Sequence, residues 1–209
     1  GIAVSLAVNA ARLPRGRDKR TLFITGLDGV LWEPGKAMSA FSKIRLVHLL
    51  EHGAQITAVT GRSPASFLPM LKDIPFSLPI ITMNGAALYH LPSNTYAYCQ
   101  TIPQEITERL QALFHQRQVN CFVKAVIHDV LHVYYGPFTN EAQQAVYRAH
   151  HGGHYENYVC AGLPQGHEAI CLTVIDTSAM IERLCREISN APFSDALRCL
   201  CHSDRAHPH

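Results

Sequence analysis

Charged residues are scarce in this 209-residue sequence, at 16%, and the formal net charge is only +2. A chain so near neutrality gives no electrostatic reason to expect nucleic acid as a partner. No apolar run approaches the roughly 18–20 residues that a membrane-crossing helix needs, so no membrane span is predicted. Hydrophobic residues make up 47% of the chain, which indicates a globular protein of one large or two small domains.

The first twenty residues carry a concentration of positive charge that follows a short apolar stretch over residues 2–8. A secretory signal has its charge before the apolar stretch, so this order excludes one. A transit peptide fits somewhat better, but we expect residues 1–20 to be a flexible leader of a cytoplasmic protein. The basic residues of this leader are Arg12, Arg15, Arg17, Lys19 and Arg20.

Seven cysteines occur at irregular spacing, and their odd number does not suit a disulfide framework. Several lie in apolar, strand-like runs, which is typical of reduced, buried thiols in the cytosol. The C-terminal cysteines and histidines lack the paired Cys-x₂₋₄-Cys spacing of structural zinc sites, so we predict no zinc there. The cysteines are Cys99, Cys121, Cys160, Cys171, Cys185, Cys199 and Cys201.

Short buried strands alternate with helices in the first part of the chain. Runs rich in β-branched residues predict strands over 21–25, 54–60 and 79–83. Between them, Ser39 begins one helix that ends near Gly53, and Ser63-Pro64 begins another that ends near residue 73. This order predicts a right-handed βαβαβ unit with three parallel strands. The buried stripe of its first helix is expected to be Phe41, Ile44, Val47 and Leu50.

After Gly85 the predicted strands and helices no longer alternate regularly, and their order becomes that of an α+β region. Strands are expected over 86–89, 95–100, 121–127, 130–135, 169–175 and, more weakly, 196–201. Helices are expected over 103–118, 140–150 and 177–188, and a Gly- and His-rich loop follows the second of them. We therefore divide the chain into a leader (1–20), a core (21–88), a second region (89–201) and a tail (202–209).

Polar or glycine-rich turns follow all three early strands. They are Gly26-Leu27-Asp28-Gly29, Thr60-Gly61-Arg62 and Asn84-Gly85-Ala86. Because ligands of open α/β sheets bind beyond the carboxyl ends of the strands, these turns are expected to converge on one crevice. Taken singly, Asp28 reads as a turn aspartate and Thr60 as a strand-end hydroxyl.

Together these turns resemble the motifs of the haloacid dehalogenase (HAD) superfamily. Residues 23–31 resemble its first motif, a strand followed by Asp-x-Asp-Gly-Thr/Val, and 59–62 its second, a strand ending in Thr-Gly-Arg. Residues 81–86 resemble the Asn-Gly-Ala strand end of the Cof-like sugar-phosphatase branch. The resemblance implies a partial Rossmann-like α/β core with parallel strands, followed by an α+β cap domain.

The resemblance also implies a chemistry. In this family a first aspartate attacks phosphorus and a second protonates the leaving group, while a hydroxyl, a lysine and Mg²⁺ hold the phosphoryl group. Asp28 matches the acid/base position, and its backbone carbonyl matches a Mg²⁺-ligand position. Thr60 matches the phosphate-binding hydroxyl. The positions that line the phosphate and substrate crevice are Gly61, Arg62, Asn84 and Gly85.

Three features depart from the family pattern. Gly26 stands at the nucleophile position, and the neighbouring Thr25 points to the opposite face of the strand. The last lysine of the sequence is Lys124, so no lysine follows the cap, and the late Gly-Asp-x-x-x-Asp metal motif is absent. These departures predict loss of the covalent route.

Three functions stay open at this point. The first is a phosphatase-family protein with impaired or no activity that binds a phosphorylated small molecule. The second is a Mg²⁺-dependent sugar phosphatase in mutated or truncated form. The third is a non-enzymatic interaction module. A core of three strands leaves an open sheet edge or an apolar face, so we expect a second copy or another chain to cover it.

Overall fold

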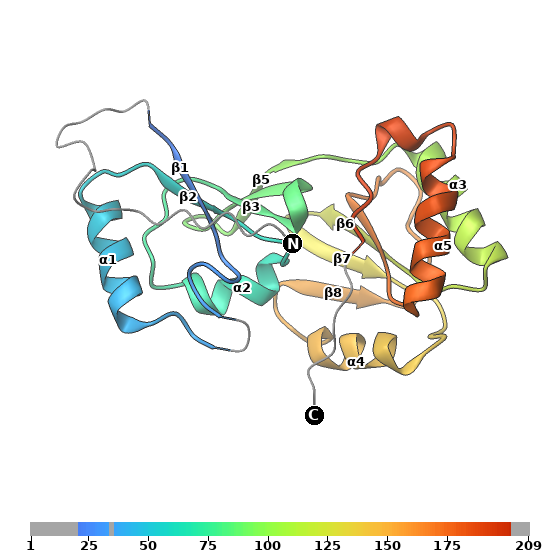
Figure 1. The fold of residues 1–209 in the computed structure, drawn as a ribbon, viewed down its shortest axis with the longest axis horizontal. Helices are drawn as coiled ribbons and strands as arrows, with labels where there is room; N and C mark the ends of the chain where they lie inside the picture. Colours follow the sequence, from blue (N-terminus) through green and yellow to red (C-terminus); the bar gives the residue numbers. More distant parts are fainter. Residues whose placement is uncertain (1–20, 34–35, 202–209) are drawn as a thin grey trace. The chain divides into compact units, whose positions relative to one another are not determined.

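The structure is a computed structural model that describes residues 21–33 and 36–201. The chain divides into two compact units, Gly1–Gln100 and Thr101–His209 (Figure 1). The predicted leader and tail lie outside the described residues. Within the described ranges, every helix is too short or too polar to cross a bilayer.

Unit 1 is built on a five-stranded mixed sheet in the order β1-β2-β3-β4-β5. Strands β1 (Phe23–Gly26), β2 (Ile56–Val59) and β3 (Ile80–Thr82) are parallel, as predicted. Strands β4 (Ala87–His90) and β5 (Thr95–Cys99) form a hairpin that pairs antiparallel with β3. The hairpin therefore extends the core sheet beyond residue 88, where the sequence analysis ended the core.

Two helices pack against one face of this sheet. Helix α1 (Ala40–Glu51) begins where Ser39 Oγ accepts a hydrogen bond from Ser42 N, and helix α2 (Pro64–Leu71) begins after Ser63. The predicted stripe of α1 is wrong in part, because Phe41 and Ile44 are 73% and 68% exposed. The core cluster instead includes Leu46 of α1, Phe67 and Leu71 of α2, and the strand residues Ile56, Ala58 and Ile80.

The opposite face of the sheet exposes apolar side chains near β1. Ile24 and Val59 are 44% and 38% exposed, although both lie on strands. They alternate with Phe23, Ile56 and Ala58, which pack into the core cluster, so they point to the other face. Strand β1 pairs only with β2 among the described strands.

Unit 2 contains a four-stranded sheet in the order β8-β7-β6-β9 and three helices (Figure 1). The predicted hairpin of β6 (Cys121–Ile127) and β7 (Val130–Tyr134) is confirmed, and its turn residues His128 and Asp129 have positive φ angles of 51° and 59°. Helices α3 (Gln104–Gln116), α4 (Glu141–His150) and α5 (Ser178–Ser189) and strand β9 (Cys171–Val174) match the predicted elements.

Two predictions for unit 2 were wrong. Strand β8 (Glu156–Val159) lies where a Gly- and His-rich loop was expected, and it pairs in parallel with β7. The strand expected at 196–201 is absent: the short 3₁₀ helix Ser194–Ala196 is followed by extended chain without strand pairing. Strand pairing at both sites depends on distant partners rather than on local sequence.

Helices cover both faces of the unit 2 sheet. Cys121 of β6 packs against the cluster formed by α3 and α5, whereas the next residue, Phe122, lies beside Tyr158 of β8 in a group of rings that includes Tyr147 of α4. Successive strand side chains point to opposite faces, so α3 and α5 lie on one face and α4 on the other. Burial raises the pKa of the Cys121 thiol to about 12, which keeps it protonated.

The expectation that all cysteines are reduced was wrong for one pair. Cys185 and Cys201 form a disulfide, and Cys199 lies beside it as a free, exposed thiol. The strand cysteines Cys99, Cys121 and Cys171 are reduced, as expected.

Candidate active site

The carboxyl ends of β1 and β2 bring two predicted site residues into direct contact. Thr60 Oγ1 donates a hydrogen bond of 3.1 Å to Asp28 Oδ2, across 32 residues of sequence. The register that pairs Gly26 with Val59 places both residues just beyond the last paired positions. Thr60 is 5% exposed, so its hydroxyl is held in a fixed position at the edge of the sheet.

Arg62 also contacts Asp28. Its Nε atom donates to Asp28 Oδ1 at 2.8 Å, and its Nη1 atom donates to Ser66 Oγ at 3.0 Å. The Thr60 hydroxyl accepts a hydrogen bond from Arg62 N at 3.0 Å, which closes the turn after β2. The two charged side chains are about one third exposed, at 33% and 38%, so water screens the ion pair.

A third donor to Asp28 was missed by the sequence analysis. Trp32 Nε1 donates to Asp28 Oδ1 at 3.2 Å, and the indole is 4% exposed. The turn after β1 brings it there, because Gly29 N donates to Trp32 O at 2.8 Å and Gly29 has a φ of +74°. In the sequence, only the spacing of four residues between Asp28 and Trp32 hinted at this contact. The folded turn is what points the indole N–H at the Asp28 carboxylate.

The end of β3 completes the cluster. Asn84 N donates to Thr60 O at 3.1 Å, and the Arg62 carbonyl accepts from both Met83 N at 3.1 Å and Thr82 Oγ1 at 2.6 Å. A Cβ atom at Gly61 would lie 3.0 Å from Asn84 Oδ1, so a side chain there would require the Asn84 amide to shift. The three strand ends therefore converge, as the sequence analysis predicted.

Gly26 lies at the end of β1, two residues before Asp28. Its φ is outside the left-handed region, and a Cβ atom placed on it would meet only Val30, with 3.2 Å to Cγ2 and 3.8 Å to Cβ. Val30 is 51% exposed and has room to move. Thr25 donates its hydroxyl to the carbonyl of Gly26 at 3.1 Å, and adjacent strand residues point to opposite faces.

Among the described residues, this cluster offers Mg²⁺ one carboxylate, and that carboxylate already accepts three hydrogen bonds. Mg²⁺ requires a near-octahedral set of oxygen ligands and is usually held by one or two carboxylates. The cluster offers a single carboxylate, Asp28, whose oxygens already accept from Thr60, Arg62 and Trp32. A guanidinium 2.8 Å from that carboxylate competes with a cation for the same negative charge.

The parallel strands define a Rossmann-like α/β protein. The polar cluster lies at their carboxyl edge, which is where open α/β sheets bind ligands. The model of the haloacid dehalogenase-like hydrolase family matches residues 23–204. Because this match covers most of the chain, the protein belongs to the haloacid dehalogenase-like hydrolases. No curated protein sequence matches the chain significantly.

Solved structures share the fold at low sequence identity. The protein TM0651 of Thermotoga maritima is 24% identical with a TM-score of 0.59, and 83% of this chain aligns with 62% of it. A haloacid dehalogenase-like hydrolase of Bacteroides thetaiotaomicron is 14% identical with a TM-score of 0.62, at 81% and 63% coverage. The HAD subclass IIB sugar phosphatase BT4131 is 22% identical with a TM-score of 0.57, at 79% and 62% coverage. The chain thus spans less than two thirds of these structures.

Proposed function

We propose that this HAD-like protein binds a phosphorylated small molecule at the cluster of Asp28, Thr60, Arg62 and Asn84, and that it lacks the covalent hydrolytic step. The observation that carries the proposal is Gly26, which offers no atom to attack phosphorus at the end of β1. The groups that would bind a phosphate remain together around Asp28.

Arg62 and Thr60 supply the chemistry for phosphate binding. A guanidinium has five N–H donors in a planar fork that suits phosphate oxygens. Among the described residues, Arg62 donates to Asp28 through Nε and to Ser66 through Nη1, and its guanidinium carries further N–H donors. The hydroxyl of Thr60 donates to the same Asp28 carboxylate that Arg62 contacts.

A sugar phosphate is the ligand class that we favour. One of the structures that share the fold is described as a sugar phosphatase of HAD subclass IIB. An active, Mg²⁺-dependent parent enzyme, of which this chain is a mutated or truncated form, is the alternative. That alternative requires a nucleophile at the end of β1, where this chain has Gly26.

Phosphate binding is expected to depend on Arg62. Arg62→Ala removes a charged donor, and a hydrogen bond to a charged group contributes about 1.5–3 kcal/mol, so binding should weaken about 10- to 100-fold. Isothermal titration with glucose 6-phosphate or inorganic phosphate measures the change. Arg45→Ala is the matched control, because Arg45 is an exposed arginine of α1 that lies over the Phe41 ring.

Two results would contradict the proposal. One is an Arg62→Ala variant that binds phosphate as tightly as the unmodified chain. The other is an equal loss in Arg45→Ala, which would indicate that phosphate responds only to net charge. Thermal unfolding of both variants establishes that they are folded.

A second candidate role is self-association through β1. Among the described strands, β1 is an edge of the sheet, and the face beside it exposes Ile24 and Val59. We propose that β1 pairs with β1 of a second copy, because one two-fold pairing would satisfy the strand edge and cover the apolar residues of both copies.

Ile24→Lys is expected to abolish this self-association. A lysine on the edge strand places a charge in the apolar contact, and edge lysines oppose strand pairing. Light scattering after size exclusion should give a dimer for the unmodified chain and a monomer for the variant. Tyr98→Lys on β5, at the opposite edge of the same sheet and 53% exposed, should remain dimeric. A monomeric unmodified chain at micromolar concentration would exclude the role.

A further inference from the structure

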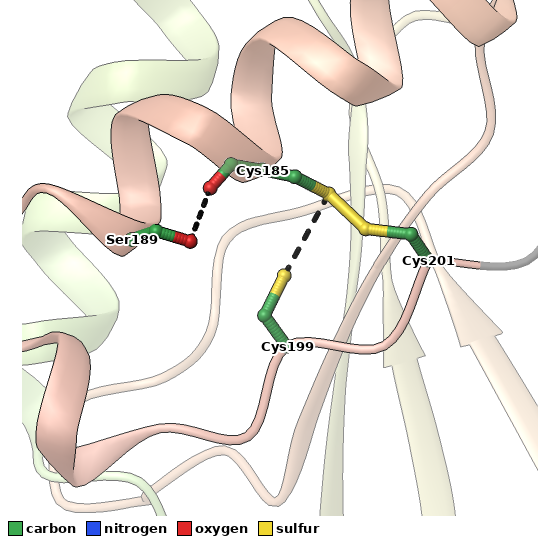
Figure 2. Close-up of a disulfide and its surroundings, with 4 residues drawn as sticks. All are labelled: Cys185, Ser189, Cys199 and Cys201. Carbon is green, nitrogen blue, oxygen red and sulfur yellow. Dashed lines mark hydrogen bonds between the residues drawn. A yellow bond between two sulfur atoms is a disulfide. The ribbon is translucent and has the colours of Figure 1, made fainter.

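Three cysteine sulfur atoms meet at the end of unit 2. Cys185 lies on α5, and Cys199 and Cys201 lie on the extended segment after the last 3₁₀ helix (Figure 2). All three sulfur atoms lie within 4.8 Å of one another. Cys185 is half-buried and the other two are exposed, so solvent reaches the cluster.

The spacing within this cluster suits a tetrahedral metal site. Cys199 Sγ lies 3.9 Å from Cys185 Sγ. With metal–sulfur bonds of about 2.3 Å, two thiolates on a tetrahedral zinc ion lie roughly 3.8 Å apart. The Cα atoms of Cys185 and Cys201 are 7.3 Å apart, which exceeds the usual disulfide range of about 4.4–6.8 Å. The backbone therefore holds these two residues at a separation that suits sulfurs sharing an ion.

The hydrophobic core of unit 2 fixes both elements that carry the cysteines. Leu184 and Ile188, on either side of Cys185, are buried in the cluster formed with α3. Leu197, two residues before Cys199, packs against the same cluster. Ser189 Oγ also donates to the carbonyl of Cys185 at 2.7 Å (Figure 2). Ligands held by a packed framework lose little freedom on binding a metal.

We propose that Cys185, Cys199 and Cys201, when reduced, bind one thiophilic divalent cation of the zinc class, with the fourth position open to solvent. A thiol or phosphine reductant supplies two electrons and the solvent two protons, which converts the Cys185–Cys201 disulfide into two thiols. The cation then displaces protons from the three thiols as the metal–sulfur bonds form. Oxidation to the disulfide removes two of the three ligands, so binding is coupled to redox state.

A cation that binds the three thiols replaces their protons, so its affinity should rise with pH.

Cobalt titration tests the proposal directly. The chain, reduced with a phosphine and kept free of oxygen, is expected to bind one equivalent of Co²⁺ with a thiolate-to-metal charge-transfer band and the strong visible bands of a tetrahedral site. Zn²⁺ should displace the cobalt and bleach these bands. The oxidised chain should show neither. Absence of the charge-transfer band in the reduced chain would overturn the proposal.

Cys199→Ser separates this site from unspecific thiol binding, since it removes a ligand and leaves the disulfide pair intact. Its Zn²⁺ affinity is expected to fall at least about 100-fold, because the loss of mere outer-shell partners already costs about 10- to 100-fold. Cys160→Ser is the matched control: Cys160 is exposed, lies in the same unit and is outside the cluster. Zn²⁺ should also raise the melting temperature of the reduced chain and of Cys160→Ser, but not of Cys199→Ser. Equal affinities of all three proteins would contradict the assignment.

Discussion

Neither the unmodified chain nor Gly26→Asp is expected to hydrolyse an aryl phosphate with Mg²⁺ at an enzymatic rate. Glycine has no side chain to form the phosphorylated intermediate, and the 209 residues contain no lysine after Lys124 to hold the phosphoryl oxygens. Against a typical turnover of about 10 s⁻¹, we expect a deficit of about 10⁴-fold or more. Release of nitrophenolate over hours, compared with protein-free buffer, measures both rates.

Gly26→Asp tests the missing nucleophile without demanding a strained backbone, because Gly26 is outside the left-handed region. Among the described residues, a Cβ there would contact Val30 at 3.2 Å, and Val30 is half-exposed. Asp28→Asn in the Gly26→Asp background is the control for a contaminating phosphatase.

The possible outcomes distinguish the loss of the nucleophile from the loss of the lysine after the cap. Turnover by the unmodified chain would contradict the proposed function. Turnover by Gly26→Asp alone would mean that the nucleophile was the one missing part, and that a lysine after the cap is dispensable. A second carboxylate two residues from Asp28 would then also supply the oxygen ligand that the present cluster lacks for Mg²⁺.

The candidate site was largely predictable because its residues follow local rules. Asp28, Thr60 and Asn84 each lie within two residues of the end of a strand, and parallel strands end at the same edge. The sequence does not say which of these groups touch. The bond from Trp32 to Asp28 depends on the positive φ of Gly29, and the bond from Arg62 depends on the turn closed by Thr60.

The fold was predictable where elements are set by their own sequence and less so where partners are distant. Helices start at Ser39, Asn140 and Thr177, which are residue types that commonly cap helices. In the structure each of these side chains accepts a hydrogen bond from the N–H three residues ahead. Strand β8 was missed because its polar sequence becomes a strand only beside β7. The cysteine cluster was missed because Cys185 comes from a helix 14 residues before Cys199.

Gln143 is the residue whose loss should destabilise unit 2 most among its polar side chains. It is fully buried on α4, with an exposed fraction of 0%. Its Oε1 atom accepts from Thr139 N at 2.9 Å and from Asn120 Nδ2 at 3.2 Å. Its Nε2 atom donates to Thr139 Oγ1 at 2.9 Å and to Ile175 O at 3.0 Å. One side chain thus joins α4 to three loops beside the sheet.

Gln143→Ala is expected to lower the free energy of unfolding of unit 2 by about 3 kcal/mol, because the buried Asn120 amide loses its acceptor and a cavity remains. The amide N–H of Thr139 and the side chain of Asn120 lose the bonds they make to Oε1, whereas Ile175 O keeps a bond from Asn140 Nδ2. Hydrogen exchange followed by mass spectrometry measures the loss as faster exchange of the amides of β6 and β7.

Gln144→Ala provides the matched comparison, because the neighbouring glutamine is only partly buried and accepts a hydrogen bond from Arg148 on the same helix. It should change the stability of unit 2 by less than about 0.5 kcal/mol. Fluorescence of Trp32, the only tryptophan, reports on unit 1 and should be unaffected by either substitution if the two units unfold separately. A Gln143→Ala variant with unchanged exchange in β6 and β7 would contradict the network, since four hydrogen bonds to a fully buried amide cannot be lost without cost.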